Sequence, residues 1–222
     1  MDLNFYNTIQ ELNKHKVFYW VCHGSLLGLA RNGDLIPWDH DIDIAVWEGE
    51  YTEEYIINIF KLMGFKWNQE HPEGSLSFKR SGGRSVDVNF YKDCKSSKKL
   101  ACCLHRLPKS KIGSLLDKLA HNKKYKGRYE LTYRFLKLFK FILVPLYKRL
   151  DKPGVLYIEK GYTTPKDLLI NFIDVDYFGV NCKVPKNFKS INAYIYGEQW
   201  LLPNQKYNWM TDSSSVINQI SQ

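Results

Sequence analysis

A short run of alternating side chains, from Asp41 to Val46, constrains the fold more than any other part of this sequence. Asp41 and Asp43 alternate with the apolar Ile42 and Ile44, which is the pattern of a strand with one face in a core and the other facing water. Both carboxylates then project from one face, with Cα atoms roughly 6.6 Å apart at a rise of about 3.3 Å per residue. Two acids this close repel each other unless a cation neutralises them, and hard oxygen ligands select Mg²⁺ or Mn²⁺. A solvated strand edge, or two aspartates that cap turns, is the alternative.

Two further segments extend this acidic pattern. Asp87 lies between two valines on a second expected strand, 84–91, and it would bring a third acid to the first two if the strands pair, because neighbouring strands lie about 4.8 Å apart. A salt-bridged strand residue is the alternative interpretation of Asp87. Gly24 and Ser25 form a turn before a short helix, so backbone N–H groups there can approach an anion at the helix N-terminus. The sequence therefore offers acids for a metal ion and a glycine turn for a phosphate.

Hydrophobic periodicity and turn residues indicate a chain that mixes helices and strands. From Lys92 to about Lys111 the pattern is irregular and predicts a loop, with one strand around 100–104. The other expected elements are a helix from an Asp2 cap to about Lys14, a buried strand at 17–21, a helix capped by Thr52 and ended by Gly64, a hairpin of 75–80 and 84–91, a helix over 123–149, a strand over 178–186 and a last helix before Tyr196.

Charge is distributed unevenly along the 222 residues. The chain has 32 Lys and Arg against 23 Asp and Glu, a net charge of +9, and its 44% hydrophobic content argues against a disordered or fibrous protein. Residues 92–152 contain 18 Lys and Arg against four Asp and Glu, a net charge of +14 that leaves −5 for the rest. A basic balance favours an anionic partner such as nucleic acid, a phosphorylated substrate or an acidic membrane surface.

The expected helix over 123–149 has three interpretations. Leu131, Phe135 and Leu138 share one face, whereas Arg134 and Lys137 lie on the other. The helix can pack in a domain with a solvated basic face, attach to a membrane surface, or bind nucleic acid. No nucleic-acid recognition motif accompanies the charge, so we expect no nucleic-acid partner.

Cysteine usage and the chain's apolar segments suggest a location. The five cysteines are an odd set without Cys-x-x-Cys spacing, which predicts reduced thiols and no zinc site. The N-terminus lacks the basic and then apolar pattern of a signal peptide, and the longest apolar run, 141–147, is too short to span a bilayer. We expect a cytoplasmic protein, attached peripherally to the inner face of the membrane if the basic helix binds lipid.

Other polar residues have structural interpretations. His23 precedes the glycine turn as an expected structural histidine, and strand alternation turns His40 away from the two acids that follow it. Asp174 and Asp176 repeat the Asp-x-Asp spacing, but no glycine-serine turn precedes them. They are therefore not expected to bind the metal.

Two neighbouring segments together resemble a known family. His-Gly-Ser-Leu-Leu-Gly-Leu-Ala-Arg at 23–31 and Ile-Pro-Trp-Asp-His-Asp-Ile-Asp-Ile at 36–44 resemble the signature of the LicD family of the nucleotidyltransferase superfamily. That family includes bacterial phosphocholine transferases and the fukutin and fukutin-related ribitol-phosphate transferases. Phe178-Gly179 with 184–187, and Tyr196-Gly-Glu-Gln-Trp200 with Pro203, are similar to its closing motif. The basic middle matches no family motif.

The resemblance implies an architecture. We expect an α+β, nucleotidyltransferase-like fold in which a mixed central β-sheet is flanked by helices and carries a basic helical insertion. The chain would form a single domain, 1–222. Its catalytic core would cover about 1–91, the basic, partly helical insertion about 92–152, and a C-terminal part, 153–222, would close the core.

The resemblance also implies roles for single residues. Asp87 would complete the metal site or accept the nucleophile's proton, and Trp38 would stack on a donor base or sugar, or pack at the rim. Arg31 would neutralise an oxyanion of the donor. The catalytic and metal-binding residues would be Asp41, Asp43 and Asp87, the donor- and phosphate-binding residues Gly24, Ser25, Arg31 and Trp38, and the support residue Asp39.

A metal-dependent phosphotransferase is the implied activity. It would move a substituted phosphate, such as phosphocholine or a polyol phosphate, from a CDP-linked donor to a sugar hydroxyl of a cell-surface glycan or glycolipid: lipopolysaccharide, capsule or teichoic acid. Mg²⁺ or Mn²⁺ would be the cofactor. One alternative is a nucleotidyltransferase that moves a nucleoside monophosphate to a small molecule, protein or RNA. Another is a non-enzymatic basic binding module.

Overall fold

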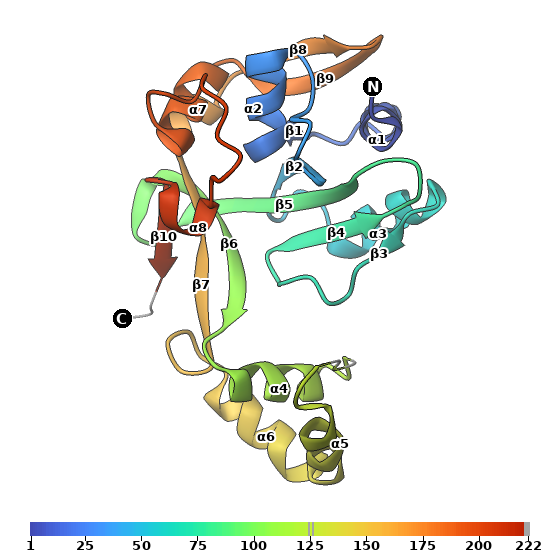
Figure 1. The fold of residues 1–222 in the computed structure, drawn as a ribbon, viewed down its shortest axis with the longest axis vertical. Coiled ribbons are helices and arrows are strands. Elements are labelled where there is room, and N and C mark those ends of the chain that lie inside the picture. Colours follow the sequence, from blue (N-terminus) through green and yellow to red (C-terminus); the bar gives the residue numbers. More distant parts are fainter. Residues whose placement is uncertain (124, 126, 220–222) are drawn as a thin grey trace. The chain divides into compact units, whose positions relative to one another are not determined.

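The chain forms two compact units in a computed structural model that describes residues 1–123, 125 and 127–219 (Figure 1). The first unit contains residues 1–104 and 161–217, and the second contains residues 105–160 and those from 218 onward. Two strands, β6 and β7, carry the chain out of the first unit and back into it. The grouping of all 222 residues into one domain stays a prediction.

A mixed β-sheet organises the first unit. Its strand order is β1-β2-β5-β6-β7-β10, and β4 pairs with both β3 and β5. The pair β2 and β5 is parallel, whereas β1, β4 and β6 run antiparallel to their partners. The strands of this sheet are β1 (Trp20–Val21), β2 (Asp41–Trp47), β3 (Lys66–Trp67), β4 (Ser75–Lys79), β5 (Ser85–Cys94), β6 (Ser97–Pro108), β7 (Tyr157–Pro165) and β10 (Val216–Gln219).

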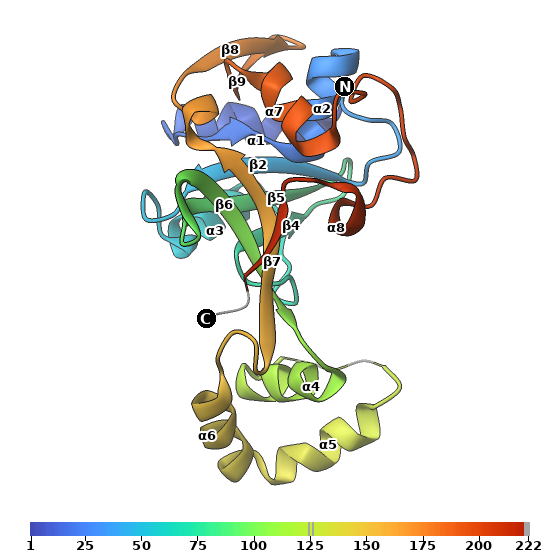
Figure 2. The same cartoon turned by 90° about the vertical axis from the view of Figure 1, so that its left-hand side faces the viewer.

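Helices flank this sheet, as predicted. Figures 1 and 2 show α2 and α7 on one side of β2 and β5, and α3 on the other. The expected caps are present, because the Asp2 side chain accepts hydrogen bonds from the first amides of α1 and Thr52 accepts one at the start of α3. The helices are α1 (Leu3–Lys14), α2 (His23–Asn32), α3 (Glu53–Leu62), α7 (Phe188–Tyr196), α8 (Trp209–Asp212) and the 3₁₀ helix η1 (Lys166–Leu169).

A small hairpin lies apart from the main sheet. It pairs β8 (Phe172–Tyr177) with β9 (Val180–Pro185) antiparallel. Phe178 and Gly179 form the turn with positive φ angles of 49° and 85°, so the expected strand over 178–186 begins only after that turn. The first strand of the hairpin was not predicted.

The apolar residues of the alternating strands form the core. Ile42 and Ile44 of β2 are fully buried, so the polar residues between them face the opposite side of the sheet. Beneath this sheet the Phe60 ring of α3 stacks on Phe78 of β4, with centroids 4.0 Å apart. This packing holds β2 rigidly and so fixes the direction of its two aspartates.

The second unit consists of three helices, which are α4 (Lys111–Ala120), α5 (Glu130–Leu138) and α6 (Lys140–Leu150). Both α5 and α6 pack on α4, around buried Leu115, Leu119 and Tyr133. The predicted continuous helix over 123–149 was wrong. Its apolar periodicity runs across Phe139, but the chain turns there and brings both halves against α4. Residues 124 and 126 of the predicted helix lie outside the described residues.

The loop predicted from Lys92 to about Lys111 was also wrong, although the strand expected around 100–104 is present as part of β6. The long strands β5 and β6 occupy most of this segment, and α4 begins at its end. Cys94, Cys102 and Leu104 form a small buried cluster that holds these strands, and the many lysines between them hide the strand alternation. The buried strand expected at 17–21 shortens to Trp20–Val21, because the Phe18 amide donates to the Tyr51 hydroxyl (2.7 Å) instead of a strand partner.

Two predictions from composition concern the whole chain. All five cysteines are free and buried in the structure, as expected for reduced thiols. Within the described residues, none of the helices has the length and apolar character needed to cross a membrane.

Candidate active site

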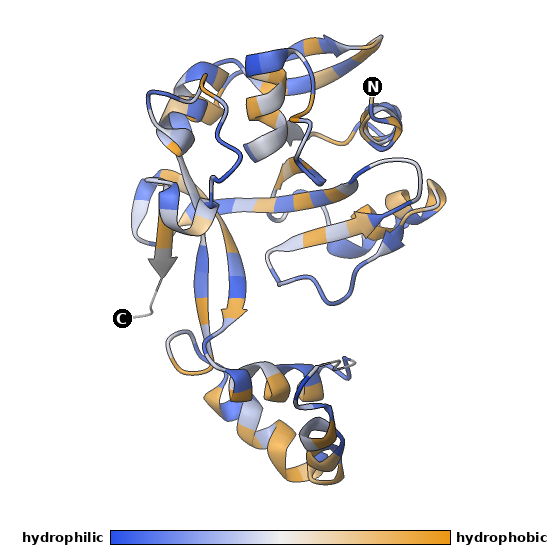
Figure 3. Ribbon diagram, viewed as in Figure 1, coloured by the Kyte–Doolittle hydropathy of each residue, from blue (hydrophilic) through white to orange (hydrophobic). Residues whose placement is uncertain are grey.

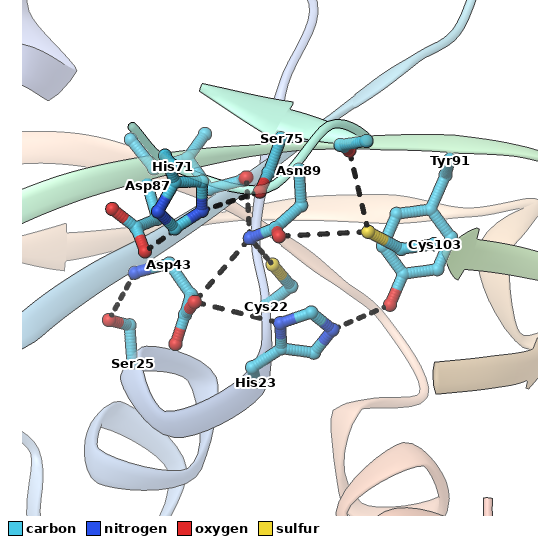
Figure 4. Close-up of polar contacts among 12 residues, drawn as sticks. Cys22, His23, Ser25, Asp43, His71, Ser75, Asp87, Asn89, Tyr91 and Cys103 are labelled. Carbon is cyan, nitrogen blue, oxygen red and sulfur yellow. Dashed lines mark hydrogen bonds and ion pairs between the residues drawn. The ribbon is translucent and has the colours of Figure 1, made fainter. Parts of the chain in front are cut away.

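The site begins with two aspartates that face each other across parallel strands. Asp43 of β2 and Asp87 of β5 occupy the same register position, and Ser77 of β4 lies opposite Asp87 on its other side. Directly paired residues on adjacent strands lie about 4.8 Å apart in the hydrogen-bonding direction. Figure 4 shows both carboxylates on the same side of the strands. The structure thus brings together the acids that the sequence placed on separate strands.

The N-terminus of α2 lies directly against Asp43. The Cys22 amide donates to the Asp43 carbonyl oxygen (3.1 Å), and the Asp43 amide donates to the Ser25 hydroxyl (2.9 Å). These two hydrogen bonds fix the start of α2 to β2. The Cys22 side chain makes no capping hydrogen bond, and the Gly24 amide instead donates to the Asp43 side chain. The positive end of the α2 dipole lies at the same place and attracts anions.

Gly24 lies directly against the acidic side chains. A Cβ atom there would lie 2.4 Å from Asp39 Oδ2 and 3.6 Å from Asp43 Oδ2. Asp39 therefore belongs to the same cluster as Asp43, and both carboxylates contact the backbone at the start of α2. The expected helix start at Leu26 was too late, because α2 already begins at His23.

Two buried polar side chains, His23 and Asn89, lie against Asp43. The His23 Nδ1 atom lies 3.6 Å from Asp43 Oδ1, and its Nε2 atom lies 2.9 Å from the Tyr91 hydroxyl. The Asn89 side-chain amide also points at Asp43 Oδ1, at 3.4 Å. His23 has a φ of 44°, a strained conformation for a residue other than glycine, and this conformation directs its ring between its two partners (Figure 4).

The sequence interpretation missed part of this support. Asn89 and Tyr91 follow Asp87 at intervals of two on β5, so strand alternation alone would have placed all three on one face. His71 was also missed. Its Nε2 atom lies 3.9 Å from Asp87 Oδ2 and 2.8 Å from the Ser75 hydroxyl, but it belongs to a loop whose sequence gives no such signal.

Burial and mutual repulsion hold protons on the acidic cluster. Burial, with the charge of Asp41, raises the pKa of Asp43 to about 8, and burial likewise raises the pKa of Asp39 to about 7 and of Asp87 to about 6. Burial also lowers the pKa of His23 to about 4. At neutral pH His23 is therefore uncharged, and it supplies no compensating charge to Asp43.

The donor chemistry of the cluster would suit a divalent cation. Asp87 Oδ1 is buried and has no hydrogen-bond partner among the described residues, which is costly for a carboxylate oxygen unless a further group is present. The surrounding donors are carboxylates from Asp39, Asp41, Asp43 and Asp87. Hard oxygen ligands of this kind suit Mg²⁺ or Mn²⁺.

Arg31 and Trp38 lie together, but at the other end of α2. The Arg31 guanidinium carbon lies 5.8 Å from the centre of the Trp38 ring, and Arg31 Nε donates to Asn32 Oδ1 at 2.8 Å. From Ser25 to Arg31 the helix rises roughly 9 Å. Trp38 packs against the cluster of Leu27, Ile36 and Trp200. The structure does not bring these two side chains to the carboxylates, and their roles in donor binding stay predictions.

The second Asp-x-Asp pair lies elsewhere. Asp174 and Asp176 are on β8, where Asp174 pairs with Lys183 (2.9 Å) and Asp176 accepts a hydrogen bond from the Gly179 amide (3.1 Å). Both residues are exposed. Their spacing equals that of Asp41 and Asp43, but they lack the helix N-terminus and the third acid.

Comparison with known proteins finds similarity over the segment that contains this site. Residues 16–91 match the family model described as "LicD/FKTN/FKRP, nucleotidyltransferase domain". The ribitol 5-phosphate transferase FKRP of Mus musculus and that of Homo sapiens are each 58% identical to this chain over 31 residues, which is 14% of this chain and 6% of either relative. An uncharacterized protein of Rickettsia typhi is 36% identical over 61 residues, 27% of this chain and 20% of that protein.

Among solved structures, that of the antibiotic-resistance factor ANT(2'')-Ia is similar at 12% identity and a TM-score of 0.34, over 67% of this chain and 94% of that one. The matched segment of the family model, in contrast, contains every residue of the acidic cluster and the start of α2. Residues 16–91 of this chain are therefore similar to the LicD/FKTN/FKRP nucleotidyltransferase domain, whereas the chain spans only a small part of the length of the curated relatives it matches.

Proposed function

We propose that this chain is a metal-dependent phosphotransferase with a nucleotidyltransferase-like fold. It moves a substituted phosphate, such as phosphocholine or a polyol phosphate, from a CDP-linked donor to a sugar hydroxyl of a cell-surface glycan: lipopolysaccharide, capsule or teichoic acid. One observation carries the proposal. Asp43 and Asp87 lie in register on parallel strands, beside the N-terminus of α2. The match of residues 16–91 to the LicD/FKTN/FKRP family model and the activity named for the FKRP relatives support it.

Asp41, Asp43 and Asp87 would hold Mg²⁺ or Mn²⁺, and Asp39 supports them. When bound, the cation polarises the diphosphate of the donor and neutralises charge on the departing nucleoside monophosphate. Asp43 would be the central ligand, because Asn89 and His23 both direct ring or amide nitrogens at its Oδ1 atom. These contacts orient one oxygen, while Oδ2 faces Gly24 at the start of α2.

The start of α2 would bind a phosphate of the donor. The positive dipole end of α2 attracts an anion, and Gly24 lets the anion approach the backbone because glycine has no side chain. Ser25 has a different task from the one expected. Its hydroxyl oxygen accepts the Asp43 amide proton, so it first fixes β2 to α2, although its own proton remains free to reach a donor oxygen.

Asp87 would take the proton of the attacking sugar hydroxyl. Its Oδ1 atom has no hydrogen-bond partner among the described residues, and burial raises the pKa of Asp87 to about 6. A carboxylate with a pKa near the working pH is a better proton acceptor than one with an ordinary value. The acceptor would be a glycan or glycolipid, and the reaction would take place in the cytoplasm.

The test is release of CMP from CDP-linked donors. The whole chain is incubated with Mg²⁺ and a panel of donors, CDP-choline, CDP-ribitol and CDP-glycerol, and CMP is measured with and without a glycan acceptor. We expect one donor to be used, and Asp43→Asn to lower turnover by at least about 100-fold. Asp174→Asn is the matched control, because it makes the same change at an exposed Asp-x-Asp pair, and it should keep full turnover.

The mass of the product separates the alternatives. An acceptor that gains phosphocholine or polyol-phosphate mass supports the proposal, whereas one that gains a nucleoside monophosphate makes the chain a nucleotidyltransferase. Full turnover by Asp43→Asn would show that the acidic cluster does not take part in the reaction. If no donor is hydrolysed and the protein binds neither Mg²⁺ nor a CDP-linked donor, the chain is a basic binding module instead.

A further inference from the structure

The outer surface of α5 and α6 is strongly apolar and exposed. Leu131 is 81% exposed, Leu138 70% and Phe141 75%, although soluble proteins rarely leave large apolar side chains together in water. Figure 3 colours much of both helices as hydrophobic. This outer surface consists of Leu131, Phe135, Leu138, Phe139, Phe141, Ile142, Leu146 and Leu150.

The outer surface is not needed for the core of the second unit. Leu131, Phe135 and Leu138 recur at intervals of four and three on α5, so they form one stripe. Tyr133 lies on the opposite side of this helix and is buried against Leu115 of α4. The unit therefore has a core of its own and a second apolar face, which the other described residues leave exposed.

Basic side chains accompany this surface. Residues 105–160 contain 15 Lys and Arg against four Asp and Glu, a net charge of +11. On the two helices Arg134, Lys137, Lys148 and Arg149 are exposed. Long basic side chains can lay their methylene stems along an apolar surface while the charged ends reach outward to anions. The matching partner is one that offers an apolar layer and negative charge side by side.

We propose that the outer surface of α5 and α6 binds a bilayer that contains anionic phospholipids, with both helices lying in the headgroup region. The helices are about 14 and 17 Å long, too short to span a hydrocarbon core of about 30 Å, but they suit an interfacial position. A bilayer supplies acyl chains to the leucines and phenylalanines and phosphates to the lysines and arginines.

Charge argues against the other occupants. A second copy of this chain would bring two surfaces of the same strong positive charge together, which repel. A nucleic acid would satisfy the basic side chains but would leave Leu138 and Phe141 without an apolar partner. The proposal does not depend on the enzymatic activity, because none of its residues lies in the acidic cluster.

Vesicle cosedimentation of the full chain tests the proposal. We expect binding to vesicles of phosphatidylcholine mixed with phosphatidylglycerol, little binding to phosphatidylcholine alone, and release by salt. The double substitution Leu138→Ser with Phe141→Ser should lower the partition coefficient about tenfold for each side chain. The control is Leu62→Ser with Leu202→Ser, whose side chains are also exposed but lie in the first unit.

A second pair of variants tests the charges. Lys148→Gln with Arg149→Gln should lower binding to the anionic vesicles about fivefold for each charge, whereas Lys61→Gln with Lys189→Gln in the first unit should not lower it. All four variants touch exposed side chains, and circular dichroism spectra that match the wild type confirm their folding.

Three results would overturn the proposal. The first is absence of binding to anionic vesicles at low salt. The second is binding of single-stranded RNA that competes fully with vesicles and is unaffected by Leu138→Ser with Phe141→Ser, which would assign the surface to nucleic acid. The third is a dimer in light scattering that the same double substitution dissociates, which would assign the surface to a second copy.

Discussion

Asp43→Asn should stabilise the metal-free protein at neutral pH, although it removes a residue that the proposed reaction needs. Burial, together with the charge of Asp41, raises the pKa of Asp43 from 3.8 to about 8. Above pH 4 the unfolded chain therefore releases a proton that the folded chain keeps. The free energy of unfolding of the wild type therefore falls as the pH rises toward 8. Asparagine has no carboxyl proton to lose, so Asp43→Asn does not show this decrease.

The size of the effect follows from proton linkage. One additional bound proton changes the free energy of unfolding by about 1.4 kcal/mol per pH unit, so the advantage of the variant would grow by at most about 2.7 kcal/mol from pH 5 to pH 7. The Asp43 side chain is 17% exposed, and Asp39 and Asp87 hold part of the cluster's protons. We therefore expect about half of the maximum, which corresponds to a Tm difference of roughly 3–6 °C.

Thermal unfolding in EDTA, followed by circular dichroism at several pH values, measures this difference. His23 acts in the opposite direction, because burial lowers its pKa from 6.5 to about 4. Its contribution makes the folded state more stable as the pH rises to 6.5. Both proteins contain His23, so this contribution cancels when the variant is compared with the wild type. Asp174→Asn should show no such pH-dependent difference.

Magnesium should reverse the order of stability. A cation that binds only the folded protein adds about 2.7 kcal/mol at 100 times its Kd, and it must displace protons from the cluster, so the gain is larger at pH 7 than at pH 5. The wild type should gain and Asp43→Asn should not. Equal gains in both proteins, or an unfolding difference that does not change between pH 5 and pH 7, would refute the assignment of Asp43 as a buried, cation-binding carboxylate.

Three further substitutions separate site from scaffold. Gly24→Ala places a Cβ 2.4 Å from Asp39 Oδ2, a side chain that can move, so CMP release should fall at least about tenfold with little change in Tm; full activity would contradict the phosphate-binding role. Gly28→Ala places a Cβ 2.7 Å from the Asp34 carbonyl oxygen, and because backbone moves less easily, urea unfolding should show a loss of about 1–3 kcal/mol. Phe78→Ala removes the ring stacked on Phe60 and should cost about 3–5 kcal/mol in the same assay, whereas a smaller loss would mean that the site collapses around the cavity.

Strand alternation and helix caps carried most of what could be predicted. Asp41 and Asp43 were placed on one face of a strand because polar and apolar residues alternate there with the two-residue repeat of a strand. Asp2 and Thr52 marked helix starts because their side chains can accept hydrogen bonds from the first backbone amides of a helix. The sequence could not supply the register between β2 and β5. That register depends on the packing of the whole sheet, and a shift by one residue would turn Asp87 to the core.

The errors arose where the local pattern fits more than one structure. The apolar stripe from Leu131 to Leu146 has helical periodicity throughout, so nothing in it marks the turn at Phe139, which is set by packing on α4. The missed segment, the end of β5 with the first half of β6, contains Lys92, Lys98 and Lys99 and buries Cys94 and Cys102, and this composition is untypical of a strand core. In both places the tertiary contacts decide the structure.

Helix geometry also explains why the site residues of α2 separate into two groups. Gly24 and Ser25 are in the first turn, whereas Arg31 lies six residues after Ser25, about 240° further around the axis and roughly 9 Å along it. The Arg31 side chain would have to pass around the helix to reach the carboxylates. Its guanidinium instead faces Trp38, and Nη2 is buried with no hydrogen-bond partner among the described residues. If Arg31 binds the donor, it therefore contacts a part of that molecule that lies away from the metal-bound phosphates.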